Sequence, residues 1–216
     1  MSKILNENIY NYLNNFLSES DGLLSEMEEF AKQNRIPILE KSSAEFLEQL
    51  ILIKNSKTIL EIGTAIAYSS IRIARLLPEG ASLDTIELSK NNIKLANSFI
   101  KKANLATKIN LLEGNAFTII PKLQNKYDFV FLDADKEDYL NLLELILPKL
   151  KTGGILFVDN LLWKGYVAET AKQEIPGKYQ GSTNKIREFN DKFVKHCKLK
   201  AIILPLGDGI GLAVKL

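Results

Sequence analysis

From residue 57 onward, short apolar runs alternate with helix-like stretches, and this alternation constrains the fold more than any other feature of the chain. The strand-like runs are TILEI, SLDTIEL, KINLLEG, DFVFLD and GILFVDN. The helical patterns between them are YSSIRIARLL, SKNNIKLANSFIKKAN, AFTIIPKL and EDYLNLLELILPKL. Nearly continuous apolar strands separated by helices are typical of a parallel sheet that is covered on both faces. The sequence therefore predicts an α/β fold with a doubly wound, mostly parallel sheet.

The two ends of the chain add different elements to this sheet. Near the C-terminus, LKAIILPL and GIGLAVKL flank GDG, which predicts an antiparallel hairpin. Near the N-terminus, amphipathic patterns predict helices over about 9–17, 20–34 and 42–55, the last beginning at a serine cap. We expect a single domain, with residues 1–55 as a helical extension and 56–216 as the cofactor-binding core.

Counts of particular residues exclude several classes of site. The only histidine, His196, lies beside the only cysteine, Cys197, in a helical pattern. The sequence therefore offers no internal disulfide, no zinc site built from a His/Cys cluster and no G-x-S-x-G nucleophile motif. No apolar run is long enough to span a bilayer, and the first residues do not form a secretory signal. We expect a cytoplasmic protein that does not contact membranes, with catalysis based on Asp, Glu, Lys, Asn or a metal.

Polar residues follow each of the five predicted parallel strands. They are Glu61 and Gly63 after the first strand, Glu87 after the second, Gly114, Asn115 and Ala116 after the third, Asp133 after the fourth, and Asp159 and Asn160 after the fifth. One acid at a strand end is more often a helix cap than a ligand. However, ligands of doubly wound sheets bind at the carboxyl ends of the strands, and a whole edge of such residues predicts a binding site there.

The loop in TILEIGTAIAYSS contains one glycine, Gly63, where cofactor loops usually carry two or three. The dinucleotide fingerprint G-x-G-x-x-G lets a pyrophosphate approach the backbone, so its absence indicates a cofactor without a pyrophosphate. Glu87, at the end of the next strand, is placed to accept hydrogen bonds from both ribose hydroxyls. A positively charged nucleoside beside these carboxylates describes S-adenosylmethionine (SAM).

A second constellation lies in FLDADKEDY and FVDNLLWKG. Asp133, Asp159 and Asn160 offer oxygen ligands from two adjacent strand ends, which suits Mg²⁺, while Mn²⁺ and Ca²⁺ also fit. Lys136 lies one helical turn beyond Asp133. We expect a nearby cation and a partly dry pocket to disfavour its ammonium form, so that Lys136 can act as the catalytic base.

Four motifs together resemble the metal-dependent class I O-methyltransferases of the catechol and caffeoyl-CoA type. They are LEIGTAIAYSSIRIARLL, FLDADKEDYL, GGILFVDNLLWKG and LPLGDGIGLAVK, and the resemblance runs from about residue 36 to the C-terminus. It implies a Rossmann-like class I methyltransferase sheet, a divalent metal on Asp133, Asp159 and Asn160, and proton removal from the substrate by Lys136. The cofactor pocket that it implies is lined by Glu61, Gly63, Tyr68, Ser69, Glu87, Ala116 and Asp133, and the neighbouring Leu88, Gly114 and Asn115 complete the predicted set.

The chain departs from this family at Ala67, where glycine is common. We expect its methyl group to narrow the cofactor pocket or to shift the loop. A nucleotide-binding or oxidoreductase module on the same fold is a further hypothesis, which the missing glycine fingerprint disfavours.

The acceptor must offer two adjacent oxygens for chelation, as a catechol does and as 5-hydroxyuridine does in RNA. Within the family, IPILEKSSAEFLEQL, DNLLWKGYVAE, KIREFN and AIILPLGDG resemble the bacterial tRNA 5-hydroxyuridine methyltransferases. This implies methylation of 5-hydroxyuridine at the wobble position to 5-methoxyuridine, with the tRNA anticodon loop as partner. Methylation of small catechol-like phenols is the alternative.

The segment 163–187 is rich in lysine and aromatic residues. Its glycines and proline suggest a loop beside the site, where it could bind single-stranded RNA, and a solvated loop with a local charge excess is the alternative. The N-terminal amphipathic helices carry more apolar surface than one sheet domain needs. We therefore expect a homodimer.

Overall fold

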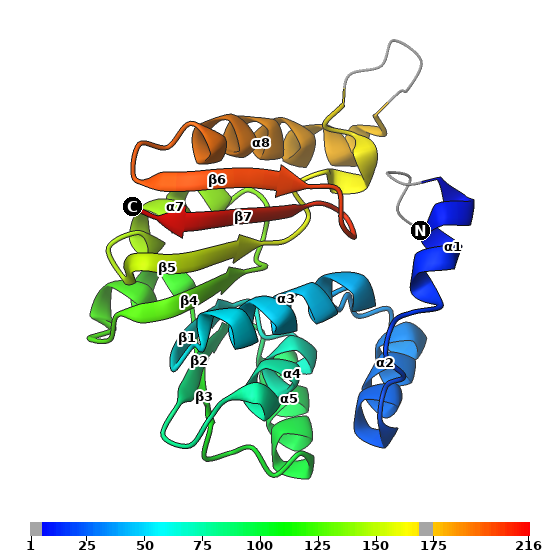
Figure 1. The fold of residues 1–216 in the computed structure, drawn as a ribbon, viewed down its shortest axis with the longest axis vertical. Helices are drawn as coiled ribbons and strands as arrows, with labels where there is room; N and C mark the ends of the chain where they lie inside the picture. The colour runs from blue at the N-terminus through cyan, green and yellow to red at the C-terminus, as the bar shows by residue number, and fades with distance from the viewer. Residues whose placement is uncertain (1–5, 169–174) are drawn as a thin grey trace.

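A mixed sheet forms the centre of the protein in the computed structural model, which describes residues 6–168 and 175–216 (Figure 1). Its strands are β1 (Thr58–Ile62), β2 (Ser82–Glu87), β3 (Ile109–Glu113), β4 (Tyr127–Leu132), β5 (Leu150–Val158), β6 (Leu199–Leu204) and β7 (Ile210–Lys215). They lie in the order β3-β2-β1-β4-β5-β7-β6. The strands β1 to β5 are parallel, whereas β7 is antiparallel to both of its neighbours. This confirms the predicted sheet and its C-terminal hairpin.

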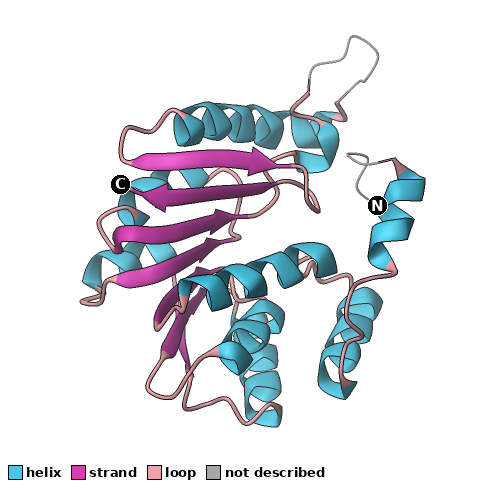
Figure 2. Ribbon diagram, viewed as in Figure 1, coloured by secondary structure: helices cyan, strands magenta, loops and turns pink. Residues whose placement is uncertain are grey.

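Helices flank this sheet on both faces (Figure 2). They are α1 (Glu7–Asn14), α2 (Gly22–Asn34), α3 (Lys41–Lys54), α4 (Tyr68–Leu76), α5 (Lys90–Lys102), α6 (Ala116–Ile119), α7 (Tyr139–Ile146) and α8 (Gly177–Val194), with short 3₁₀ turns η1 (Ile120–Lys122) and η2 (Trp163–Gly165). No helix in the described part of the chain is long and apolar enough to cross a membrane.

Two local predictions about these helices are wrong. The third helix begins at Lys41 after Glu40, without a side-chain cap, so no serine caps it. The segment 163–187 is not one loop, because 177–187 form the first part of α8. Its residues Glu169, Lys172 and Glu174 lie outside the described residues.

The apolar strands supply two cores, because alternate side chains point to opposite faces of the sheet. Phe131 and Phe157 pack in one cluster with residues of α2, α3, α4 and α5. Val130 and Leu156 pack in the other cluster with residues of α7 and α8. A strand with a core on each side must be apolar throughout, which explains the unbroken runs in the sequence.

The strand order reverses beside β1, which pairs with β2 on one side and with β4 on the other. The loops that leave β1 and β4 touch at this point. The amide of Asp133 donates to the carbonyl of Ile62 at 2.9 Å. A Cβ atom on Gly63 would lie 1.8 Å from the carbonyl oxygen of Asp133. Only glycine fits there, so the close contact between the loop after β1 and the loop after β4 depends on Gly63.

Candidate active site

The loop between β1 and α4 adopts glycine-type backbone conformations at three alternate positions. The φ angle is 102° at Gly63, 48° at Ala65 and 70° at Ala67. Two alanines therefore adopt the left-handed backbone conformation that glycine usually supplies, so the loop forms without further glycines. The side chain of Ala67 is fully buried within the hydrophobic cluster of α3 and α4. Its methyl group thus points into the core, and the expectation that it narrows the cofactor pocket is wrong.

The side chain of Glu61 is fully buried and anchors this loop and the start of α4 by hydrogen bonds. Its carboxylate accepts hydrogen bonds from the hydroxyls of Ser69 at 2.5 Å, Thr85 at 2.6 Å and Ser70. Burial raises the pKa of Glu61 to about 7, although the three hydroxyls lower it and Asp133 adds a smaller increase. Glu61 and Ser69 were predicted to line the cofactor pocket, but both side chains bond within the protein.

Glu87 ends β2 and remains partly exposed. One of its carboxylate oxygens accepts from the amide of Ala65, and the other accepts from the amide of Ser89, each at 2.8 Å. Its backbone carbonyl accepts from the amide of Gly114, also at 2.8 Å. The next side chain, Leu88, is 66% exposed. A carboxylate and a bare apolar side chain thus lie together at the strand end.

Two other predicted cofactor residues use their side chains for hydrogen bonds within the protein. The hydroxyl of Tyr68 is engaged by Glu28 and Arg72. The side chain of Asn115 caps α6 by accepting from the amide of Phe117 at 2.8 Å, next to Ala116. A ligand at the start of α4 would therefore meet backbone groups and not these side chains. Helix α4 begins after Ala67, which provides no side-chain cap, so the first N–H groups of α4 can bind an anionic group.

Asp133 and Asp159 lie side by side at the ends of two paired strands. Leu132 and Val158 are register partners, and the amide of Asp159 donates to Leu132 at 3.1 Å. Burial first, and then the charge of Asp133, raise the pKa of Asp159 above its ordinary value. Asn160 follows with a left-handed φ of 63°, and its amide donates to Asp159 Oδ1 at 2.7 Å.

These three residues fit a divalent cation by their chemistry. Two carboxylates and one amide offer only oxygen, which suits hard cations, and a cation would offset the repulsion between the two acids. No group of three or more His, Cys, Asp or Glu side chains suited to a metal occurs among residues 6–168 and 175–216. The predicted set contains only two acids, and its remaining coordination positions would fall to water and substrate.

Lys136 reaches the same carboxylates from the loop before α7. Its Nζ donates to Asp133 Oδ1 at 3.0 Å, to the carbonyl of Ala134 at 3.1 Å and to the hydroxyl of Tyr139 at 2.9 Å. Burial lowers the pKa of Lys136, but Tyr139 and the carboxylates of Asp133 and Asp159 raise it above the ordinary value. The protein groups by themselves thus favour the ammonium form, and the expected opposite effect depends on a nearby cation.

Two contributors to this region were missed in the sequence. Tyr139 links the site together, because its hydroxyl accepts from Lys136 and donates to the carbonyl of Asp159 at 3.0 Å. Asp208, within GDG, accepts from the amides of Leu162 and Lys164. GDG predicted only a hairpin, and the one available signal was that its acid lies in the turn between two predicted strands, β6 and β7.

An aromatic and lysine cluster follows Asn160 directly. Tyr179 of α8 stacks on Tyr166 with ring centroids 5.6 Å apart, and Trp163 meets it edge-on at 6.1 Å. The Nζ atoms of Lys164 and Lys178 each lie 4.8 Å from the Tyr179 ring centroid. We call these five residues the aromatic–lysine cluster. Arg187, which was grouped with these lysines in the sequence, donates instead to the carbonyls of Tyr166 and Val167.

Comparison with known proteins identifies the family. The sequence model of the family described as O-methyltransferase matches residues 15–216. The chain belongs to the O-methyltransferase family. Caffeoyl-CoA O-methyltransferase 2 of Petunia hybrida is 31% identical to it over 197 residues, which cover 88% of this chain and 81% of the relative.

Two solved structures match this O-methyltransferase over nearly their whole length. The O-methyltransferase from Bacillus cereus, solved in complex with SAH, has a TM-score of 0.83 and 26% identity, covering 97% of both chains. The O-methyltransferase TomG from Streptomyces achromogenes, involved in tomaymycin synthesis and solved in complex with SAM, has a TM-score of 0.82 and 26% identity, covering 96% of both chains. The fold and the enzyme class therefore agree with the motifs at the carboxyl ends of the parallel strands.

Proposed function

We propose that this O-methyltransferase transfers a methyl group from SAM to the 5-hydroxyl of 5-hydroxyuridine in the anticodon loop of tRNA, giving 5-methoxyuridine. The observation that carries the acceptor assignment is the aromatic–lysine cluster beside Asp159 and Asn160. Flat aromatic side chains with neighbouring ammonium groups provide the stacking and phosphate contacts by which single-stranded RNA loops are bound.

SAM is the methyl donor of this enzyme, as the SAM and SAH held by two solved relatives support. In the proposed pose, Glu87 accepts hydrogen bonds from the ribose hydroxyls, and the exposed Leu88 packs against the adenine ring. The uncapped first turn of α4 binds the methionine carboxylate through its N–H groups. The side chain of Glu61 is enclosed, so it supports the loop and does not touch the donor.

Asp133, Asp159 and Asn160 would hold a divalent cation, with Mg²⁺ as the first candidate. A cation bound there would polarise two adjacent acceptor oxygens and lower the pKa of the reacting hydroxyl. In the proposal, Lys136 touches that hydroxyl and accepts its proton in the neutral amine form, which a cation held beside Asp133 would favour. Tyr139 keeps the Lys136 amine at the site by its hydrogen bond of 2.9 Å. Holding the oxygen in line with the sulfonium methyl supplies much of the acceleration.

The direct test compares two acceptors. Purified enzyme is incubated with SAM and Mg²⁺, either with tRNA that carries 5-hydroxyuridine or with catechol, and products are measured by mass spectrometry. We expect methylation of the RNA, its loss when EDTA replaces Mg²⁺, and a decrease of at least about a hundredfold in Lys136→Ala. Methylation of catechol alone would refute the RNA assignment.

The cluster can be tested with a control from the same helix. The double variant Lys164→Ala/Lys178→Ala should raise KM for the RNA roughly tenfold and leave KM for catechol nearly unchanged, because two cation contacts are lost. Lys185→Ala is the control, since Lys185 also lies on α8 but faces Glu188 at 3.9 Å. Equal effects of the two changes on the RNA would count against the cluster.

Small phenols are a second candidate acceptor, favoured by the name of the Petunia hybrida relative, which specifies caffeoyl-CoA. A caffeoyl group carries the adjacent hydroxyls that chelation requires. In the two-acceptor test, this alternative predicts turnover of catechol and none of the RNA.

A further inference from the structure

A buried polar network ties the N-terminal helices to the start of α4. The guanidinium of Arg72 on α4 is only 6% exposed and binds the carboxylate of Glu48 on α3 with two hydrogen bonds of 2.7 and 3.0 Å. Its third nitrogen donates to the hydroxyl of Tyr68 at 2.9 Å. Tyr68 in turn donates to Glu28 on α2 at 2.7 Å. We call Glu28, Glu48, Tyr68 and Arg72 the α4 clamp.

The direction of each hydrogen bond in the clamp is fixed by charge. An arginine can only donate hydrogen bonds, so the Tyr68 oxygen accepts from Arg72 and its hydroxyl group donates to Glu28. Burial and the bond to Glu28 raise the pKa of Tyr68 to about 12, so the hydroxyl stays protonated. Ser20 also donates to the same oxygen of Glu28, at 2.5 Å. All three nitrogens of the guanidinium are used, which suits a buried charge.

The clamp meets the cofactor loop at a defined place. Tyr68 is the first residue of α4 and directly follows Ala67, whose left-handed conformation closes the loop. Ser69, the next residue, is held to Glu61 from the opposite side. The first turn of α4 is therefore fixed from two directions, by β1 through Glu61 and by α2 and α3 through Tyr68.

We infer that the α4 clamp positions the SAM-binding turn, so that helices α2 and α3 belong to the cofactor site although they do not touch the cofactor. Unrestrained backbone at Ala65 and Ala67 can relax from its strained conformation. The hydrogen bond at Tyr68 removes that freedom at the position where the free N–H groups of α4 begin. Glu28, Glu48 and Arg72 act through Tyr68 and are positioning residues.

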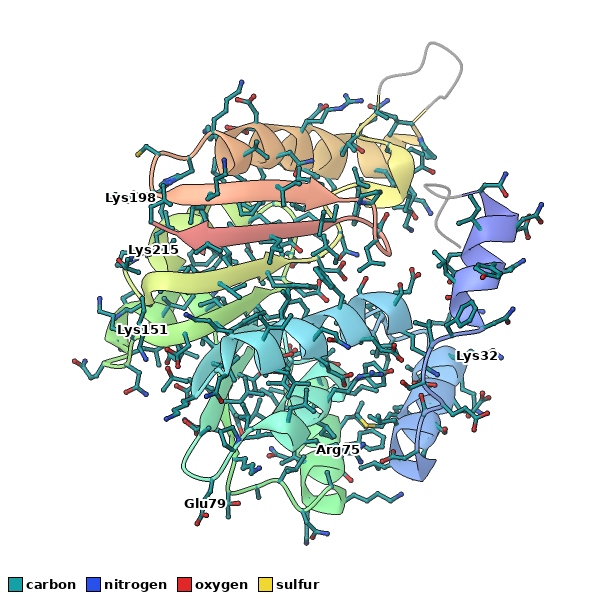
Figure 3. All side chains as sticks on the ribbon, viewed as in Figure 1. Lys32, Arg75, Glu79, Lys151, Lys198 and Lys215 are labelled. Atoms are coloured by element: carbon teal, nitrogen blue, oxygen red, sulfur yellow. The ribbon has the colours of Figure 1, made fainter. Side chains whose placement is uncertain are left out.

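The same two helices supply a matched control. Arg75, which Figure 3 labels, binds Asp21, the N-cap residue of α2, at 2.7 Å, with the two side chains 32% and 55% exposed. This ion pair also joins α2 to α4, but Arg75 lies in the last turn of α4, away from the cofactor loop. A general loosening of the helices should affect both contacts, whereas positioning of the loop should depend on Tyr68 alone.

The experiment measures SAM affinity by calorimetry, so it rests on the use of SAM and not on the proposed acceptor. Binding of SAM by the wild-type enzyme is the reference. We expect Tyr68→Phe and Glu28→Ala to weaken SAM binding about five- to tenfold, because displacement of a binding element by a fraction of an ångström weakens contacts steeply. Glu28→Gln keeps the accepting oxygen and should retain affinity within about twofold of wild type. Arg75→Gln should also keep its SAM affinity within about twofold of wild type.

Kinetics provide a second readout on the same variants. In the clamp variants KM for SAM should rise, while kcat at saturating SAM and KM for the acceptor stay within about twofold of wild type. Wild-type affinity in folded Tyr68→Phe, or an equal loss in Arg75→Gln, would overturn the inference. If Tyr68→Phe does not fold, Glu28→Ala replaces it in this test, because Glu28 lies at the outer end of the network. Wild-type SAM affinity in Glu28→Ala would then overturn the inference.

Discussion

Ala67 combines a left-handed backbone with a fully buried methyl group, and the two have opposite effects on stability. A non-glycine residue in this conformation costs about 1–2 kcal/mol. Burial of the methyl group and the smaller freedom of alanine in the unfolded chain together contribute a similar amount. The position therefore tolerates alanine where the family commonly has glycine.

Replacement of Ala67 by glycine should consequently change little. We expect Ala67→Gly to lie within about 1 kcal/mol of wild type in the free energy of unfolding, and its SAM affinity to be unchanged. Ala74→Gly is the control, since Ala74 is equally buried but helical, and it should lose about 2 kcal/mol. Urea denaturation measures both. Equal losses in the two variants would show that Ala67 carries no backbone strain.

Glu61 should make stability depend on pH. Its pKa is raised from 4.5 to about 7 in the folded protein, so the folded state holds a proton that the unfolded state has released. The contribution to stability is complete below pH 4.5 and is lost as the pH rises through 7. It amounts to roughly 3 kcal/mol at full extent. Glu61→Gln cannot titrate and should lack this part of the decline in the free energy of unfolding. Parallel pH profiles for the variant and wild type would contradict the assignment.

At the scale of elements, the C-terminal hairpin holds the loop that follows Asp159 and Asn160, two of the proposed metal ligands. The turn between β6 and β7 accepts from the amides of Leu161 and Leu162, through the carbonyls of Gly209 at 2.8 Å and Asp208 at 2.9 Å. Gly209 allows this close approach, because a Cβ atom there would lie 2.5 Å from the backbone nitrogen of Leu162. An antiparallel pair of strands thus supports the site from outside the parallel sheet.

Substitution at this turn should disturb both stability and catalysis. Gly209→Ala combines a φ of 91° with the clash at Leu162, and we expect a loss of about 3 kcal/mol together with most of the activity. Gly80→Ala has a similar φ of 76° but open space around the added methyl. It should lose only about 1 kcal/mol and keep its activity. Denaturation curves and initial rates separate these outcomes, and similar losses in both variants would exclude a supporting role for the turn.

At the scale of the whole molecule, charge is unevenly distributed. The acids Glu87, Asp133 and Asp159 lie at the carboxyl edge of the parallel strands. Lys151 and Lys215, which Figure 3 labels, lie at the opposite edge. The separation is partial, because Lys136 contacts Asp133 at one edge and Asp128 pairs with Lys151 at the other. Lys215 donates to the carbonyls of Leu147 and Leu150 at 2.7 Å, so this lysine also satisfies backbone groups of two buried residues.

Helix α1 has no buried residue and presents an apolar stripe to solvent. Ile9, Tyr12 and Leu13 are 52%, 62% and 47% exposed, and their spacing puts them on one face of the helix. Phe16, in the turn that follows α1, is 68% exposed. A second exposed apolar surface lies on α3, at Leu52 and Ile53. A helix of 8 residues is not stable by itself in water. We propose that a second copy of the chain covers these surfaces in a homodimer.

The dimer can be tested by light scattering. Leu13→Asp/Phe16→Asp should reduce the measured mass from about twice the chain mass to 24.3 kDa, because each charge would have to be buried at the interface. Val194→Asp is the control, as Val194 is also exposed, at 45%, but lies at the end of α8. A mass near 24.3 kDa for wild type would refute the dimer.

Most of the fold follows from the sequence, because strand and helix periodicity is local and turn residues mark many of the boundaries. The parallel sheet, the hairpin and the edge at which polar residues gather were all predictable in this way. The same holds for the proximity of Asp133 and Asp159, since adjacent parallel strands end at one edge.

Only the tertiary structure decided how each polar side chain at that edge is used. Glu61 bonds to Thr85, Tyr68 to Glu28 and Asp208 to Lys164, and these partners are 24, 40 and 44 residues apart in the chain. Whether an acid faces a ligand or the core depends on such distant partners, which no local pattern encodes. The sequence by itself determined the sheet, the edge at which the polar residues gather and the enzyme class. Packing between distant segments determined which residues remain free to perform it, because a buried polar group must find its hydrogen bonds within the protein.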